Sequence, residues 1–181
     1  MTHAEIRSYC LARLSELRPI IVGGTPWGFL GLSAYVDFLA KLAWDADLKS
    51  PGYKDFFKLC FPDRYSDFTY ASGRKDLPEQ FYHVLRCGIC HSFSLVPDAQ
   101  SQSNGGRYRS ILISHDGIDE SDGRAYAHLS GYRKAGMDAA ILVGGTLCDD
   151  LVRVVDKMFL DSSIQQNAES WVSKFPPIAS I

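Results

Sequence analysis

The sequence lacks a strong excess of charge of one sign, a long apolar run and an even set of cysteines. Its 181 residues hold 19 lysines and arginines against 21 aspartates and glutamates, so no general basic field is available to hold nucleic acid. The uncharged run 139–148 has ten residues, about half of what a membrane-spanning helix needs. Five scattered cysteines indicate reduced thiols rather than a disulfide framework. No secretory signal pattern begins the chain, and we expect a cytoplasmic protein without membrane contact.

Apolar residues follow helical spacing over most of the chain. The length, with 46% hydrophobic residues, predicts a single domain over 1–181 with its own core. The three- and four-residue spacing predicts a mainly α protein with helices at about 4–18, 26–47, 53–60, 76–95, 146–160 and 164–172. Pro19 is expected to end the first helix, and 63–75 to form a loop. Alternating residues predict a small antiparallel β-meander over about 107–143, inserted between the fourth helix and the next long one.

The phrase Val-Gly-Gly-Thr occurs twice, at 22–25 and at 143–146. Neither copy carries the lysine of a phosphate-binding loop or the third glycine of a dinucleotide fingerprint. We interpret both copies as glycine turns that lead into a helix.

The densest cluster of reactive side chains lies in the fourth predicted helix. Cys87, Cys90 and His91 match the haem-attachment pattern C-x-x-C-H, although covalent haem is normally attached outside the cytosol. A zinc site is the second interpretation, since His83, Cys87 and His91 recur every four residues with Cys90 adjacent. One straight helix cannot easily surround a tetrahedral ion, and Arg86 adds a fixed positive charge. Buried reduced cysteines are the structural alternative, and we expect neither metal nor cofactor.

A third interpretation takes Arg86 and His91 as an R-x-x-x-x-H pair. The segment Tyr82-x-x-x-Arg86-x-Gly88-x-x-His91 resembles the motif of the HEPN superfamily (higher eukaryotes and prokaryotes nucleotide-binding), and the likeness extends over most of 4–160. The chain departs from the family at Cys87, where active members often carry Asn, Asp or His.

The resemblance implies a HEPN-like helical bundle that acts as a homodimer through the motif helix. It also implies a metal-independent endoribonuclease, as found in toxin-antitoxin and defence systems, with an antitoxin or a nucleotidyltransferase as further partner. The alternative is a non-catalytic HEPN module that binds a nucleotide, RNA or a partner protein.

Elementary chemistry supports these residue types. RNA cleavage without a metal needs an acid, a base and positive charge on the phosphorane. His91 can serve as general acid or base, and Arg86 can stabilise the phosphorane. Each chain supplies one motif histidine, so a twofold dimer would bring two into one cleft.

Helix geometry and neighbouring residues refine this prediction. Residues five apart point about 140° from one another on an ideal α-helix, so either the long stem of Arg86 or a local distortion near Gly88 would have to bring Arg86 and His91 to one face. Tyr82 and His83 are auxiliary candidates, because Tyr82 precedes Arg86 by four residues and can orient it or stack on a base. An exposed arginine and an interfacial histidine with purely structural roles are the alternative for the pair. No function is assigned to His115 or His128.

Overall fold

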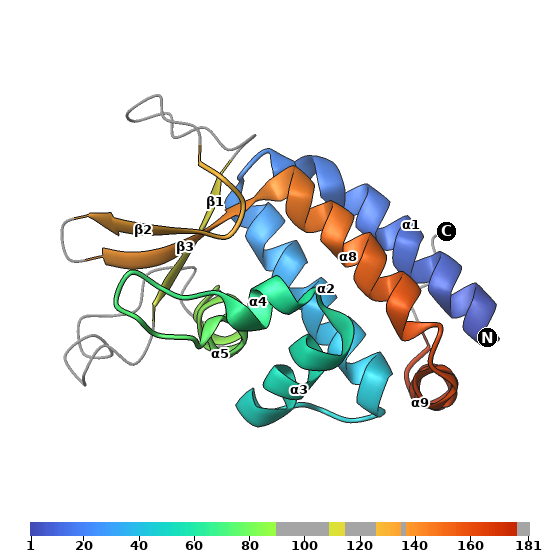
Figure 1. Cartoon of the computed structure of the whole chain (residues 1–181). Helices are drawn as coiled ribbons and strands as arrows, with labels where there is room; N and C mark the ends of the chain where they lie inside the picture. Colours follow the sequence, from blue (N-terminus) through green and yellow to red (C-terminus); the bar gives the residue numbers. More distant parts are fainter. Residues whose placement is uncertain (90–108, 115–125, 135–136, 177–181) are drawn as a thin grey trace.

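The computed structural model describes residues 1–89, 109–114, 126–134 and 137–176 (Figure 1). Its helices are α1 (His3–Val22), α2 (Pro26–Trp44), α3 (Ser50–Cys60), α4 (Asp63–Asp67), α5 (Leu77–Gln80), the π-helix η1 (Phe81–Ile89), α8 (Gly144–Met158) and α9 (Ser162–Lys174). Its strands are β1 (Ser110–Ser114), β2 (Ser130–Lys134) and β3 (Met137–Val143).

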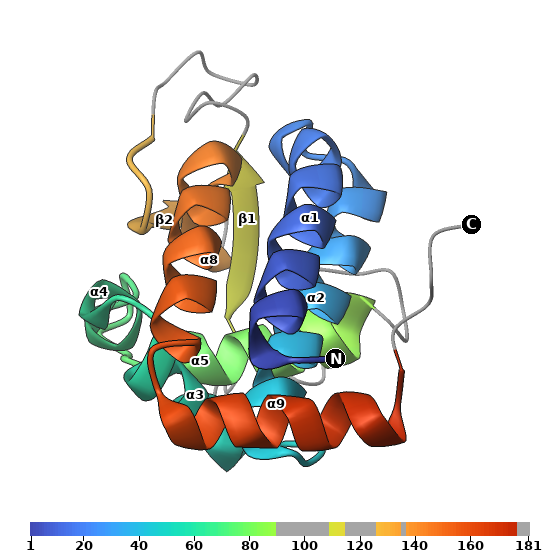
Figure 2. The same cartoon turned by 90° about the vertical axis from the view of Figure 1, so that its right-hand side faces the viewer.

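The long helices form a bundle with a small sheet at one end. Helices α1 and α8 lie side by side with α2 beside them, and the sheet lies at one end of this group (Figure 1). Helix α9 runs across the opposite end of α1 and α8 (Figure 2). The prediction of a mainly α protein with a small sheet between the motif helix and the next long helix is confirmed.

Helix α1 runs through the proline that was expected to end it. A capping box formed by Thr2 and Glu5 starts the helix. Pro19 lies inside its last turn, where Ile21 is buried and Val22 is half-buried. Proline removes one backbone donor, but the turn is held because Ile21 is buried and the Gly23 N–H donates to the Pro19 carbonyl at 3.0 Å. Core packing therefore outweighs the local cost of Pro19, and the predicted end at 18 is wrong.

The two Val-Gly-Gly-Thr segments pack against each other. A Cβ on Gly144 would lie 3.0 Å from the Val22 Cα, so glycine allows the start of α8 to approach the end of α1. Thr25 caps α2 by accepting from the Gly28 N–H at 3.1 Å, as the prediction of a helix from 26 implies. Helix α8 begins at Gly144 without a side-chain cap, two residues before the predicted start.

The sheet is mixed, so the antiparallel meander is a wrong prediction. The strand order is β1-β3-β2, and β1 runs parallel to β3 while β2 runs antiparallel to it. Residues 139–142 of β3 are all buried, the pattern of a central strand covered on both faces. A central β3 needs a neighbour on each side, and sequence alternation gives strands without saying how they pair. The second strand lies at 130–134, within the predicted range of 107–143.

The predicted helix 76–95 begins as α5 and continues as a π-helix. Hydrogen bonding of the i→i+5 type extends from Phe81 to Ile89, which is long for a helix type usually found as a single turn. Residues 90–95 lie outside the described residues. The stretch 63–75, expected to be loop, contains α4.

Candidate functional site

An aromatic cluster fixes the start of the motif helix η1. Phe81 is 1% exposed, and its ring centroid lies 4.8 Å from that of Phe57, 6.4 Å from that of Phe61 and 6.3 Å from that of Tyr65. Phe57 and Phe61 stack on each other within this cluster at 3.9 Å. Side chains from α3, α4 and η1 thus share one core, so the residues that follow Phe81 have a defined direction.

The Arg86 guanidinium is held on one edge and on one face. Its Nε lies 2.7 Å from Asp37 Oδ1, and its central carbon lies 5.1 Å from the centroid of the Tyr82 ring. The Arg86 side chain remains 29% exposed. No hydrogen-bond partner of its two terminal nitrogens is found within the described ranges. Tyr82, expected from its four-residue spacing to orient Arg86, does contact it.

Groups from three elements contact the Asp37 carboxylate. In addition to Arg86 on η1, the Tyr53 hydroxyl of α3 donates to Asp37 Oδ1 at 2.9 Å, and Lys41 Nζ of α2 lies 2.9 Å from Oδ2. Lys41 also lies 2.9 Å from Asp47 Oδ1. Tyr53 packs edge-on against Tyr82 with ring centroids 5.2 Å apart. We call Asp37, Lys41, Tyr53, Tyr82 and Arg86 the arginine seat.

The surroundings keep the Arg86 guanidinium and the Tyr53 phenol protonated. Burial by itself lowers the pKa of Arg86, but Asp37 and other nearby groups raise this pKa above its usual value. Burial, and then the negative charge of Asp37, raise the pKa of the Tyr53 phenol. Arg86 therefore remains a cation, and Tyr53 remains a hydrogen-bond donor.

The other predicted residues are divided between the described and the undescribed parts of the chain. His91 and Cys90 lie outside the described residues, so the Arg86–His91 pair is not seen as a pair. His83 Nε2 lies 3.8 Å from Glu79 Oε1, and Glu79 Oε2 lies 3.2 Å from Lys54 Nζ. The auxiliary residues thus differ, since Tyr82 contacts Arg86 whereas His83 faces a carboxylate. In the described part of η1, i→i+5 bonding brings residues five apart closer to one face than an α-helix does.

The described cysteines have the character of core residues, with one exception. Cys10, Cys60 and Cys148 are buried, and burial raises the pKa of these thiols to about 12, 12 and 11. Cys87 is half-buried. Among the described residues, no three side chains of the metal-binding types gather in one place. The haem and zinc interpretations also depend on Cys90 and His91, which the structure does not describe.

A buried carboxylate outside the predicted site residues lies on α8. Asp150 is fully buried, and it accepts from the Tyr65 hydroxyl at 2.9 Å and from Arg153 Nη1 at 3.3 Å. Arg64 of α4 forms an ion pair with the same carboxylate. A signal was present in the sequence, because Asp150 follows Leu147 by three residues and therefore falls on the apolar stripe of its helix.

His128 completes this network but has no nitrogen available for proton transfer. Its Nδ1 accepts the Val143 N–H at 3.0 Å, which assigns the ring proton to Nε2. That atom lies 3.0 Å from the Tyr65 hydroxyl and 3.6 Å from Asp150 Oδ2. Burial lowers the pKa of His128 despite the neighbouring Asp150, so the ring is neutral near pH 7. The network joins α4, α8 and the end of β3 and acts as a structural element.

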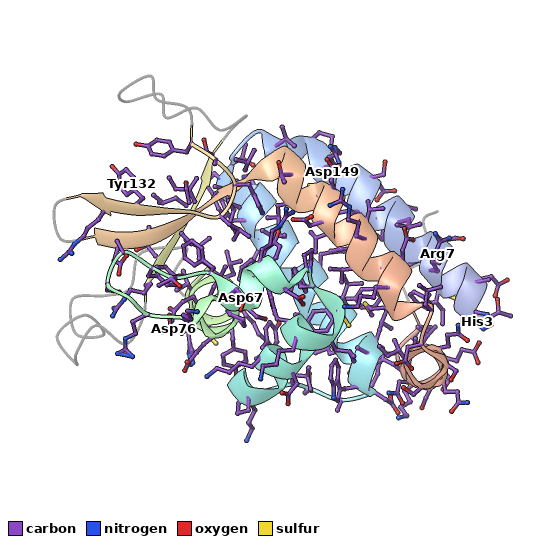
Figure 3. The ribbon with its side chains drawn as sticks, viewed as in Figure 1. His3, Arg7, Asp67, Asp76, Tyr132 and Asp149 are labelled. Carbon is purple, nitrogen blue, oxygen red and sulfur yellow. The ribbon has the colours of Figure 1, made fainter. Side chains whose placement is uncertain are left out.

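Polar contacts that link α1 with α8 and α9 supply reference positions for control variants. Arg7 lies on α1 and His3 lies at the start of α1 beside α9 (Figure 3). Arg7 Nη2 is 2.6 Å from Asp156 Oδ1 of α8, and His3 Nδ1 is 3.1 Å from Glu169 Oε1 of α9. Neither residue belongs to the arginine seat.

Comparisons of the chain with protein-family models, curated proteins and solved structures find no match. In the described residues, no helix combines the length and the apolar character needed to cross a membrane.

Proposed function

We propose that the protein is a metal-independent endoribonuclease of the HEPN type that acts as a homodimer. The observation that carries this proposal is the state of Arg86: its Nε and one face are held, while its terminal nitrogens have no partner among the described residues. A planar guanidinium presents these nitrogens in a geometry that matches two phosphate oxygens. The seat therefore offers a preoriented cation to a phosphodiester.

The proposed reaction is an attack by the RNA 2′-oxygen on the adjacent phosphorus. A base removes the 2′-hydroxyl proton, the phosphorus–5′-oxygen bond breaks, and an acid returns a proton to the leaving oxygen. The products are a 2′,3′-cyclic phosphate and a 5′-hydroxyl. Arg86 stabilises the charge on the phosphorane, and His91 is the proton carrier that the sequence motif provides.

A second copy of the chain supplies what one copy lacks. Acid and base functions need two proton carriers, and the motif holds one histidine. A twofold interface through the motif helix would place two copies of Arg86 and His91 in one cleft. We propose a cytoplasmic setting in which an antitoxin or a nucleotidyltransferase restrains this activity.

Incubation of the purified protein with mixed-sequence RNA in EDTA tests the proposal. We expect cleavage by the wild type, a loss of about 10²- to 10³-fold in Arg86→Ala and of about 10²- to 10⁴-fold in His91→Ala. Arg7→Ala and His3→Ala are the matched controls, since they remove an exposed arginine that pairs with Asp156 and an exposed histidine that contacts Glu169. Cleavage that EDTA abolishes, or that persists in both motif variants, would contradict the proposal.

A non-catalytic module that binds RNA or a nucleotide is the second candidate. The Asp37 carboxylate 2.7 Å from Arg86 Nε favours it, because a paired arginine can bind a phosphate without driving its cleavage. RNA binding that depends on Arg86 while the RNA stays intact would identify this function.

A further inference from the structure

We infer that Asp37 is a positioning residue for Arg86, which it turns so that the terminal nitrogens face a phosphodiester. This inference rests on the proposed function. Asp37 lies on α2, 49 positions before Arg86 in the chain, and no motif spacing connects the two residues. Their contact is a property of the fold.

The Nε side of the Arg86 guanidinium contacts Asp37, while its two terminal nitrogens have no partner among the described residues. A guanidinium carries five N–H donors in one plane. Asp37 engages the Nε side at 2.7 Å, and Tyr82 covers one face at 5.1 Å. The four terminal donors remain for a ligand, since no described residue accepts from them. An arginine fixed in this way loses less side-chain freedom when it binds a phosphate.

The charge balance of the seat leaves Arg86 able to attract an anion. Lys41 and Arg86 both contact the single carboxylate of Asp37, so these three groups sum to one positive charge. Asp47, the second partner of Lys41, is 73% exposed, and its charge is therefore screened by solvent. Within the arginine seat, Lys41 balances the negative charge of Asp37. The positive charge of Arg86 therefore remains available to the phosphodiester.

The carboxylate is itself held in place, which a positioning role requires. Asp37 is 16% exposed, and the Tyr53 hydroxyl donates to the same Oδ1 that faces Arg86, at 2.9 Å. One hydroxyl group and two cations, from α2, α3 and η1, therefore converge on one carboxylate. The direction of Arg86 is set by three elements of the bundle.

The two effects that Asp37 has on Arg86 predict opposite outcomes. If Asp37 only neutralised Arg86, its removal would raise RNA affinity and cleavage rate. If Asp37 positions Arg86, removal lowers kcat by about 10- to 100-fold, with a smaller change in KM. Asparagine keeps a polar side chain of nearly the same size but removes the charge that pairs with Arg86, so Asp37→Asn should lie between the wild type and Asp37→Ala.

The experiment combines cleavage kinetics in EDTA with NMR of the arginine ¹⁵Nε–¹Hε groups. The Arg86 signal is assigned by its loss in Arg86→Lys. We expect a protected signal in the wild type that weakens in Asp37→Asn and Asp37→Ala, together with the graded fall in kcat. Asp45→Asn is the matched control, because Asp45 is also half-buried and also accepts from a lysine and a hydroxyl group. Should Asp37→Ala fail to fold, Asp37→Asn carries the test.

The failure of the inference differs from the failure of the proposed function. An unchanged or raised kcat in the Asp37 variants overturns the inference even if the wild type cleaves RNA. If the wild type leaves RNA intact, the ribonuclease proposal falls, and affinity for a fluorescent single-stranded RNA replaces kcat as the readout. Affinity about tenfold weaker in Asp37→Ala then supports positioning, and equal or tighter binding overturns it.

Discussion

Replacing Asp150 with asparagine should destabilise the fold while leaving the arginine seat intact. The Asp150 carboxylate is fully buried and accepts from Tyr65 and Arg153, with Arg64 paired to it. Asparagine has nearly the same size, but it exchanges one acceptor oxygen for an amide that donates hydrogen bonds. The donors around position 150 would then face another donor.

The size of the loss depends on which donors can reach water. The side chains of Arg64 and Arg153 are 45% and 70% exposed, so both can turn to solvent at little cost. The buried Tyr65 hydroxyl donates to Asp150, whereas His128 Nε2 keeps its contact with that hydroxyl. An unsatisfied buried donor costs about 1–3 kcal/mol. We therefore expect Asp150→Asn to lower the free energy of unfolding by about 1–3 kcal/mol.

Urea denaturation followed by circular dichroism measures this loss at pH 7. Asp156→Asn is the matched control, since Asp156 lies on the same helix and pairs with Arg7 but is 46% exposed. Its loss should stay below about 1 kcal/mol. Equal losses in the two variants would refute the reasoning that burial makes Asp150 important.

Two further predictions concern packing and pH. Gly28→Ala should destabilise the protein by about 1–3 kcal/mol, because the new Cβ would lie 2.1 Å from the Ile20 carbonyl oxygen. The Cβ of Gly145→Ala meets no atom within 4 Å, and this variant should be more stable than the wild type by up to about 1 kcal/mol. Thermal denaturation that ranks the two variants the other way would show that the close approach at Gly28 is not required. Burial lowers the pKa of His128 below 6.5, so the unfolded chain binds a proton that the folded chain does not. The contribution of neutral His128 to stability is complete above pH 6.5 and is lost as the pH falls towards the lowered pKa. The free energy of unfolding should therefore fall less steeply between pH 7 and 5.5 in His128→Gln than in the wild type. Equal slopes in the two proteins would contradict a lowered pKa for His128.

Local sequence patterns predict the helices and strands of this fold better than they predict where a helix ends or how the strands pair. The apolar spacing predicted α2 from Pro26 because Thr25 caps the helix and proline suits its first turn. The local preference of proline also predicts that α1 ends before Pro19. This prediction is wrong because the burial of Ile21, a tertiary effect, extends the helix. Strand pairing failed for a similar reason, since the place of β3 at the centre of the sheet depends on what covers its two faces.

The candidate site was predictable only where its residues are close in sequence. Tyr82 and Arg86 lie four apart, and their contact was expected. Asp37 and Tyr53 reach Arg86 from other helices, which no spacing rule connects. The sequence leaves the long stem of Arg86 and a distortion near Gly88 as alternatives, and it does not predict the π-helical hydrogen bonding of η1. Asp150 left a readable signal as a charge on an apolar stripe, but its partners Arg64 and Tyr65 come from a segment predicted to be loop.

Mixing the wild type with His91→Ala tests the composite dimer site most directly. With total protein constant, a one-to-one mixture that exchanges subunits freely leaves about one quarter of the dimers with both histidines. If each cleft needs His91 from both copies, RNA cleavage in EDTA should fall to about one quarter of the wild-type rate. A fall to about one half, as for chains that act independently, or no cleavage by the wild type itself, would contradict the account.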